Sequence, residues 1–182
     1  MEEVATKVHE FFAEKAKDGD FKFFLQLRIC GYSAGRPLPE VWQVGLQDGT
    51  CPAPVVIQGE QPIGTLWNGE FEAMDRIILG RGTNFVAAAT TVLGFDQEKA
   101  AEVRDKISEQ LYQQLILAAA PIQDAIDLAR FMVETTKGFI RFSVNRPKTV
   151  SGPTEIAAIT KHEGFRWVQR KYFFPRDLNL PI

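Results

Sequence analysis

The side chains best suited to nucleophilic or metal chemistry are two cysteines, Cys30 and Cys51, and two histidines, His9 and His162. Structural zinc sites place Cys and His ligands at short recurring spacings, and neither histidine has such a spacing to the other or to a cysteine. The pattern therefore predicts no metal site and no cofactor. Cys30 lies in a run of strand-forming residues, which favours a buried thiol over a nucleophile, and both histidines are expected at the surface.

Two further segments have residue types found in ligand sites. Gly80-Arg81-Gly82 lacks the rest of a phosphate-loop or dinucleotide fingerprint. Residues 166–174 mix basic and aromatic side chains, as nucleic-acid-binding segments do. The whole chain is nearly neutral, however, with 21 basic and 23 acidic residues. That balance predicts neither a nucleic-acid nor a membrane partner, and we interpret 166–174 as an edge strand followed by a docking tail.

Length and composition favour one globular domain spanning 1–182. Hydrophobic residues make up 45% of the chain and charged residues 24%, which is ordinary for a globular protein. Two cysteines are too few for a disulfide framework, the acidic start does not read as a signal peptide, and no apolar run approaches the length of a membrane span. These features together predict a cytoplasmic protein.

The first third of the chain predicts one helix followed by strands. Apolar residues recur at helical spacing over 4–18, and Gly19 is a plausible stop. Strand-forming residues fill 21–32 and 41–46, and we expect these two strands to pair as an antiparallel hairpin with a long connection. A short strand is expected at 55–57.

A block of helices follows. The first is expected to begin at Asn68 as its N-cap, and the apolar stretch 84–93 to form a buried helix. Asp96 is a good N-cap for a helix that should reach about Leu117. Another helix is expected over 121–138, because proline favours a helix start and glycine a helix end.

The remainder predicts strands again, at 139–144, 155–160 and 165–170, with a hairpin turn at 162–164 between the last two. Strands on both sides of a helical block indicate an α+β fold. In such a fold, we expect the first and last strands to meet in the sheets.

Three stretches carry motifs that are informative in their order and spacing. Residues 27–47 contain a strand, a Gly-Tyr turn at Gly31-Tyr32 and a second strand, and 65–80 place Trp and Gly before a helix. The third stretch opens with the helix of 123–136. It continues through the small-residue turn Val150-Ser151-Gly152-Pro153 to a hairpin and a last strand, Gly164-Phe165-Arg166-Trp167. Over about 23–171, these features resemble proteasome β-subunit-like proteins of the N-terminal-nucleophile (Ntn) hydrolase family, in particular their bacterial relatives.

The resemblance implies a four-layer αββα sandwich, in which two stacked antiparallel sheets lie between helices. It also implies amide- or peptide-bond hydrolysis as the ancestral activity. The family's nucleophile is the first residue of the mature chain, usually Thr, on the first strand, and its own α-amino group can act as base. Here the sequence opens with a helical pattern, so we expect a single Ntn-like domain that lacks its first strands and its nucleophile.

Ser151 and its neighbour Gly152 are the candidate site residues that the resemblance carries over. Many family members have an Asp three residues before the Ser, and this chain has Lys148 there. A turn serine that hydrogen-bonds the local backbone is the competing interpretation. Cleavage before Thr6 would place a Thr first, but within a helical pattern rather than a strand.

Three readings therefore stay open, and the residues do not decide whether the chain is an enzyme. The first is a peptidase- or amidase-like domain that is inactive as this chain. The second is a non-catalytic assembly or interaction subunit, which associates with itself or with related subunits because missing strands would leave sheet edges open. The third is an unrelated α+β ligand-binding domain.

Overall fold

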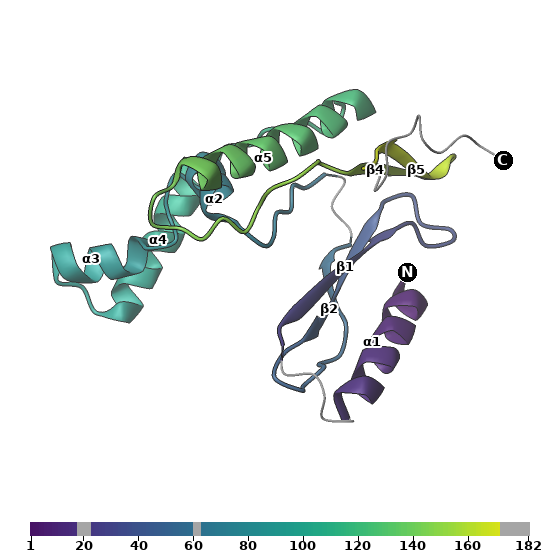
Figure 1. Cartoon of the computed structure of the whole chain (residues 1–182), viewed down its shortest axis with the longest axis horizontal. Coiled ribbons are helices and arrows are strands. Elements are labelled where there is room, and N and C mark those ends of the chain that lie inside the picture. Colours follow the sequence, from purple (N-terminus) through teal and green to yellow (C-terminus); the bar gives the residue numbers. More distant parts are fainter. Residues whose placement is uncertain (18–22, 60–62, 172–182) are drawn as a thin grey trace. The chain divides into compact units, whose positions relative to one another are not determined.

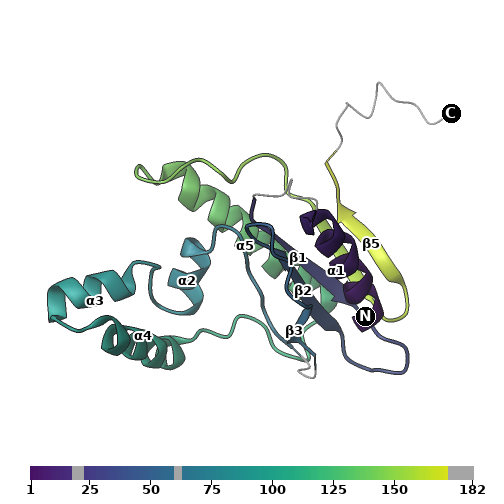
Figure 2. The same ribbon diagram turned by 90° about the horizontal axis from the view of Figure 1, so that it is seen from below.

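The computed structural model describes residues 1–17, 23–59 and 63–171, and it shows a mixed α+β protein with antiparallel sheets (Figures 1 and 2). The chain divides into two compact units. The N-terminal unit comprises Met1–Gly64 with Ala158–Arg166, and the helical unit comprises Thr65–Ala157 with the chain from Trp167 onward. Each unit is described by itself below.

In the N-terminal unit, helix α1 (Glu2–Lys17) packs on strand β2 (Glu40–Leu46). The predicted helix is confirmed, although it begins earlier than expected, and its predicted stop at Gly19 lies outside the described residues. Its buried positions are Ala5 and Ala16. Small residues at these positions let the helix approach the sheet closely.

The sheet of this unit has the order β1-β2-β3, with β1 at Leu25–Gly31 and β3 at Val55–Gln58. The predicted antiparallel pairing of β1 with β2 is confirmed, and its register runs from Leu25 opposite Leu46 to Gly31 opposite Glu40. The predicted short strand is confirmed as β3, which pairs antiparallel with β2. Val44 and Leu46 supply the buried apolar side chains of β2.

The helical unit contains α2 (Glu72–Ile78), α3 (Phe85–Leu93), α4 (Gln97–Leu111) and α5 (Ile122–Phe142). Its core joins α2 to α5 and consists of Ala73, Met74, Ile78 and Met132. Trp67, Leu79, Leu115, Leu128 and Phe139 pack against that core.

Three predictions about the shorter helices are wrong. Asn68 does not cap α2, because its side-chain oxygen accepts a hydrogen bond from the backbone N–H of Gly69 and the helix begins at Glu72. Helix α3 forms as predicted but is not buried, since Ala89 is its only buried residue. Helix α4 ends at Leu111 rather than near Leu117. The backbone becomes extended at Tyr112, and the N–H of Gln113 then donates a hydrogen bond to the carbonyl of Ile78 at 2.8 Å.

Helix α5 is longer than predicted, and this overturns the strand expected at 139–144. The helix continues through Gly138 because Ile140 falls on the same buried stripe as Met132 and Thr136. The ammonium group of Lys148 then donates to carbonyls of the last turn, at Ile140 and Arg141. A cation at this end of a helix is favourable because it satisfies free carbonyls and complements the helix dipole.

The predicted N-cap of α4 is confirmed, and it allows a direct test. Asp96 Oδ1 accepts the backbone N–H of Lys99 at 2.7 Å. We expect Asp96→Ala to lower the free energy of unfolding by about 1 kcal/mol, since one N–H of the first turn loses its partner. Asp96→Asn keeps a capping oxygen and should stay close to the wild type in urea unfolding followed by circular dichroism. Equal losses in both variants would contradict the cap.

Strands β4 (Ile156–Thr160) and β5 (Gly164–Gln169) form the predicted C-terminal hairpin. Gly164 has φ of 68°, a conformation that glycine adopts without steric cost. The expectation that the first and last strands share a sheet is wrong for the described residues, because β4-β5 and β1-β2-β3 are separate sheets. No helix in the described ranges is both long and apolar enough to cross a bilayer.

Candidate functional site

Ser151 and Gly152 lie in an exposed turn between α5 and β4. Gly152 has φ of 83°, so glycine is required there by the backbone rather than by a ligand. Ser151 makes no hydrogen bond or ion pair within the described part of the chain. Lys148, three residues before Ser151, donates to the carbonyls at the end of α5. The turn thus carries no base beside the serine hydroxyl, and the role of Ser151 stays a prediction.

The cysteines and histidines match expectation only in part. Cys30 is exposed, so the predicted buried thiol is wrong, whereas His162 is exposed as expected. His9 Nε2 lies 3.0 Å from the carbonyl oxygen of Cys51, and Cys51 Sγ lies 3.9 Å from the carbonyl oxygen of His9. These contacts go to backbone atoms and tie α1 to the chain after β2. Burial raises the pKa of the Cys51 thiol, which favours its unreactive protonated form.

A buried carboxylate lies in the N-terminal unit, and no motif in the sequence predicts it. Glu40 is 2% exposed and accepts a hydrogen bond from Trp42 Nε1 at 3.0 Å. The hydrogen bonds from Trp42 and Ser33 hold the pKa of Glu40 below its ordinary value. The amino group of Met1 donates to Ser33 Oγ at 2.7 Å. Together these contacts order the connection between β1 and β2.

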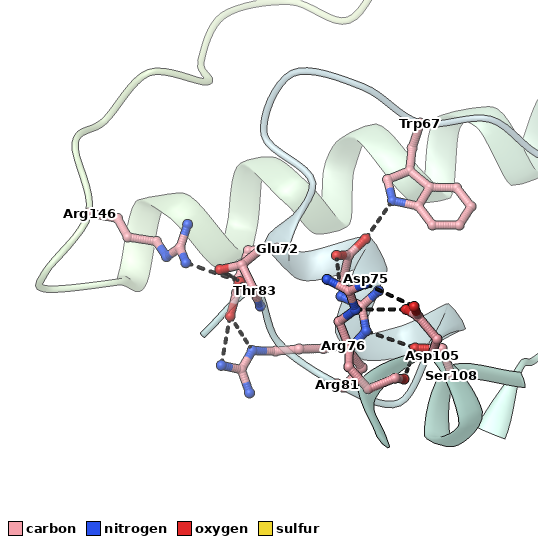
Figure 3. A network of polar contacts seen from close by, with 10 residues as sticks. Trp67, Glu72, Asp75, Arg76, Arg81, Thr83, Asp105, Ser108 and Arg146 are labelled. Atoms are coloured by element: carbon pink, nitrogen blue, oxygen red, sulfur yellow. Dashed lines mark hydrogen bonds and ion pairs between the residues drawn. The ribbon is translucent and has the colours of Figure 1, made fainter. Parts of the chain in front are cut away.

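A larger polar network surrounds α2 in the helical unit, and Figure 3 shows it from close by. Glu72 is 2% exposed. Its carboxylate accepts the backbone N–H of Thr83 at 2.8 Å, the Thr83 hydroxyl, and Arg76 Nε at 2.8 Å. Arg146, from the segment after α5, approaches the same carboxylate at 3.1 Å. Burial raises the pKa of Glu72, but the hydrogen bonds from Thr83 and Arg76 outweigh it and bring the pKa to about 2.

The second carboxylate of the network, Asp75, fixes an aromatic side chain. Asp75 Oδ1 accepts Trp67 Nε1–H at 2.9 Å, and Asp75 Oδ2 accepts from Arg81 at 3.2 Å. Arg81 Nε in turn donates to Ser108 Oγ on α4 at 2.8 Å. The chain of contacts therefore runs from Trp67 through α2 to α4 (Figure 3).

A pocket of about 330 Å³ lies beside this network, within the helical unit. We call it the helical-unit pocket; it is lined by Leu66, Trp67, Asn68, Glu70, Met74, Ala129, Met132, Val133, Thr136 and Val150. Most of its lining is apolar. Nothing in it is an activated nucleophile, since the Thr136 hydroxyl donates to the carbonyl of Met132 at 2.9 Å, a backbone oxygen that is no base. The arrangement suits binding rather than bond cleavage.

No motif in the sequence indicated the pocket or the network. Glu72 and Arg76 are spaced for an i,i+4 pair, which predicts only a surface ion pair. The residues that bury Glu72 come from further along the chain, Thr83 and Arg146. Within the described residues, no group of three or more Cys, His, Asp and Glu side chains could hold a metal ion.

The described residues thus form a mostly apolar pocket in the helical unit, and the buried carboxylates Glu40, Glu72 and Asp75 each accept a hydrogen bond. Comparisons of the chain with models of protein families, with curated proteins and with solved structures gave no match, so its own residues carry the functional interpretation.

Proposed function

We propose that this chain is a proteasome β-subunit-like protein of the Ntn-hydrolase type that serves as a non-catalytic interaction subunit, assembling with itself or with related subunits. The ordered motifs from Gly31-Tyr32 to Gly164-Phe165 support the family. The α+β content and the antiparallel pairing of both sheets are compatible with a four-layer αββα sandwich. That layering is part of the proposal.

The observation that carries the proposal is the open sheet of the N-terminal unit. Strands β1 and β3 are its two edges, and among the described strands none pairs with the outer side of either. Val55 and Val56 of β3 are exposed apolar side chains on one of these edges. An unpaired edge with apolar residues is a template for a strand from another chain, which would satisfy its free N–H and C=O groups.

The non-catalytic part of the proposal is tested with a peptidase and amidase assay on pure protein. We expect no turnover, because no described residue presents a base to the Ser151 hydroxyl and burial raises the pKa of the Cys51 thiol. Robust turnover that is abolished by Ser151→Ala or Cys30→Ala would overturn it.

The assembly part is tested by light scattering coupled to size-exclusion chromatography. We expect the wild type at a multiple of its 20.5 kDa chain mass. Val55→Lys should weaken association at least about tenfold, because a lysine on an edge strand opposes strand addition. Val144→Lys is the matched control: it makes the same change at a position that is 93% exposed and lies in no strand, and it should leave the mass unchanged. A monomeric wild type would contradict the proposal, as would equal behaviour of the two variants.

A further inference from the structure

The helical-unit pocket has the size and lining of a small-molecule site. Its volume, about 330 Å³, lies at the lower end of the range for ligand pockets, which suits a compact ligand. Two methionines that are themselves part of the core, Met74 and Met132, lie in its wall. Thioether side chains are flexible and polarisable, so they adapt to the shape of an apolar or aromatic guest.

One wall of the pocket is already in position without a ligand. The Trp67 indole packs against the core and donates its N–H to Asp75. Asp75 is held by Arg81, which is held by Ser108 of α4. A side chain fixed in this way loses little conformational entropy when a ligand binds, and this favours affinity.

The charges around the pocket cancel. Three carboxylates at or beside the pocket each pair with an arginine. Arg146 contacts Glu70 at 2.8 Å and also pairs with Glu72, Arg76 pairs with Glu72, and Arg81 pairs with Asp75. Three carboxylates thus face three guanidinium groups. A charged ligand would exchange its hydration for an apolar wall without gaining an opposite charge, so the pocket favours an uncharged one.

The polar groups in the lining accept hydrogen bonds. Thr136 is buried, and its hydroxyl donates a hydrogen bond to the carbonyl of Met132. Its oxygen can therefore only accept a hydrogen bond from a ligand. The Glu70 carboxylate is also an acceptor, and Asn68 presents an amide oxygen that accepts from Gly69. A ligand that carries one N–H or O–H group would match these acceptors.

From these four features, we propose that the helical-unit pocket binds an uncharged, mainly apolar small molecule with a single hydrogen-bond donor, about the size of indole, and that Thr136 Oγ1 accepts its donor. This binding function goes beyond the assembly role and does not depend on it.

Indole is the probe, titrated into the full-length protein and followed by ligand-observed NMR. We expect saturable one-to-one binding with a Kd of about 1 mM or tighter, as befits a ligand of this size. Ala129→Trp fills the pocket and should weaken binding at least about tenfold. Ala125→Trp is its control, because it places the same side chain one turn earlier on the exposed part of α5, outside the lining, and should change the Kd less than twofold. Absence of saturable binding, or equal Kd values for the two variants, would overturn the proposal.

The hydrogen bond from the ligand to Thr136 is tested with 1-methylindole, which lacks the indole N–H. The wild type should prefer indole at least about fivefold, since an acceptor in the pocket wall is otherwise left without its partner. Thr136→Val keeps the side-chain shape and should remove this preference. If the preference persists in Thr136→Val, it arises from the size of the added methyl group, and the role of Thr136 is refuted.

The molecular mass of each variant separates this proposal from the assembly role. Indole binding by a protein of any oligomeric state supports the pocket. If Ala129→Trp instead dissociates an oligomer and the wild type binds no indole, the pocket seats a partner chain. The small-molecule proposal then fails while the proposed assembly function stands.

Discussion

Replacing Ile78 with alanine is expected to lower the free energy of unfolding of the helical unit by about 3 kcal/mol, because it opens a cavity in a fully packed site. Ile78 is 1% exposed and lies in the core with Ala73, Met74 and Met132. The loss combines the transfer free energy of the removed methylene and methyl groups with the contacts that their neighbours lose. Urea unfolding followed by the helical circular dichroism signal measures it.

The matched control is the preceding residue. Ile77 belongs to the same helix but is 38% exposed, so Ile77→Ala removes fewer contacts and should cost less than about 1 kcal/mol. The same atoms are deleted in both variants, and the helix propensity changes equally. Similar losses at the two positions would mean that α2 has a different rotational setting from the one described.

The features that could be predicted from sequence depend on neighbours along the chain. The cap of α4 needs only Asp96 and Lys99, three residues apart, and the β4-β5 turn needs only Gly164 and its flanking strands. The β1-β2 pair follows from two strand-forming runs with a loop between them. In these cases the local signal and the final structure agree, so no distant contact is needed to decide the outcome.

The features that could not be predicted are decided by contacts between distant residues. Residues 139–144 have the composition of a strand, yet they extend α5 because Ile140 continues its buried stripe. The helical pattern around α2 does not distinguish Ile77 from Ile78, since both fit an apolar face until the partner helix is known. The sequence around Glu72 predicts an exposed side chain. In the structure its carboxylate is buried because Thr83 and Arg146, which come later in the chain, contact it.

The same distinction applies to the functional residues. A motif singles out Ser151 and Gly152, and in the structure they occupy an exposed turn. The pocket is formed by residues from two separate stretches, 66–74 and 129–150, so no single motif contains it. A pocket built in this way becomes visible only once the packing of α2 on α5 is known.

The network around α2 yields the second large effect, at Glu72. We expect Glu72→Gln to lower the free energy of unfolding at pH 7 by about 3 kcal/mol, because a buried carboxylate that pairs with Arg76 and Arg146 becomes a neutral amide. The control is Glu102→Gln. Glu102 also pairs with two cations, Lys99 and Lys106, but it is exposed and its contacts are screened by water, so its unfolding midpoint should not change measurably.

The pH dependence identifies the charge as the cause. The pKa of Glu72 is about 2 in the folded protein against an ordinary value of 4.5, so the unfolded chain takes up the proton first as the pH falls. The stability that the Glu72 carboxylate contributes is therefore complete above about pH 4.5 and is lost progressively toward pH 2. The difference between wild type and Glu72→Gln, measured in urea at pH 7, 4 and 3, should narrow at each step. Other carboxylates titrate in both proteins and cancel in that difference. A difference that stays constant from pH 7 to pH 3 would show that the loss comes from altered packing of the side chain and not from its charge.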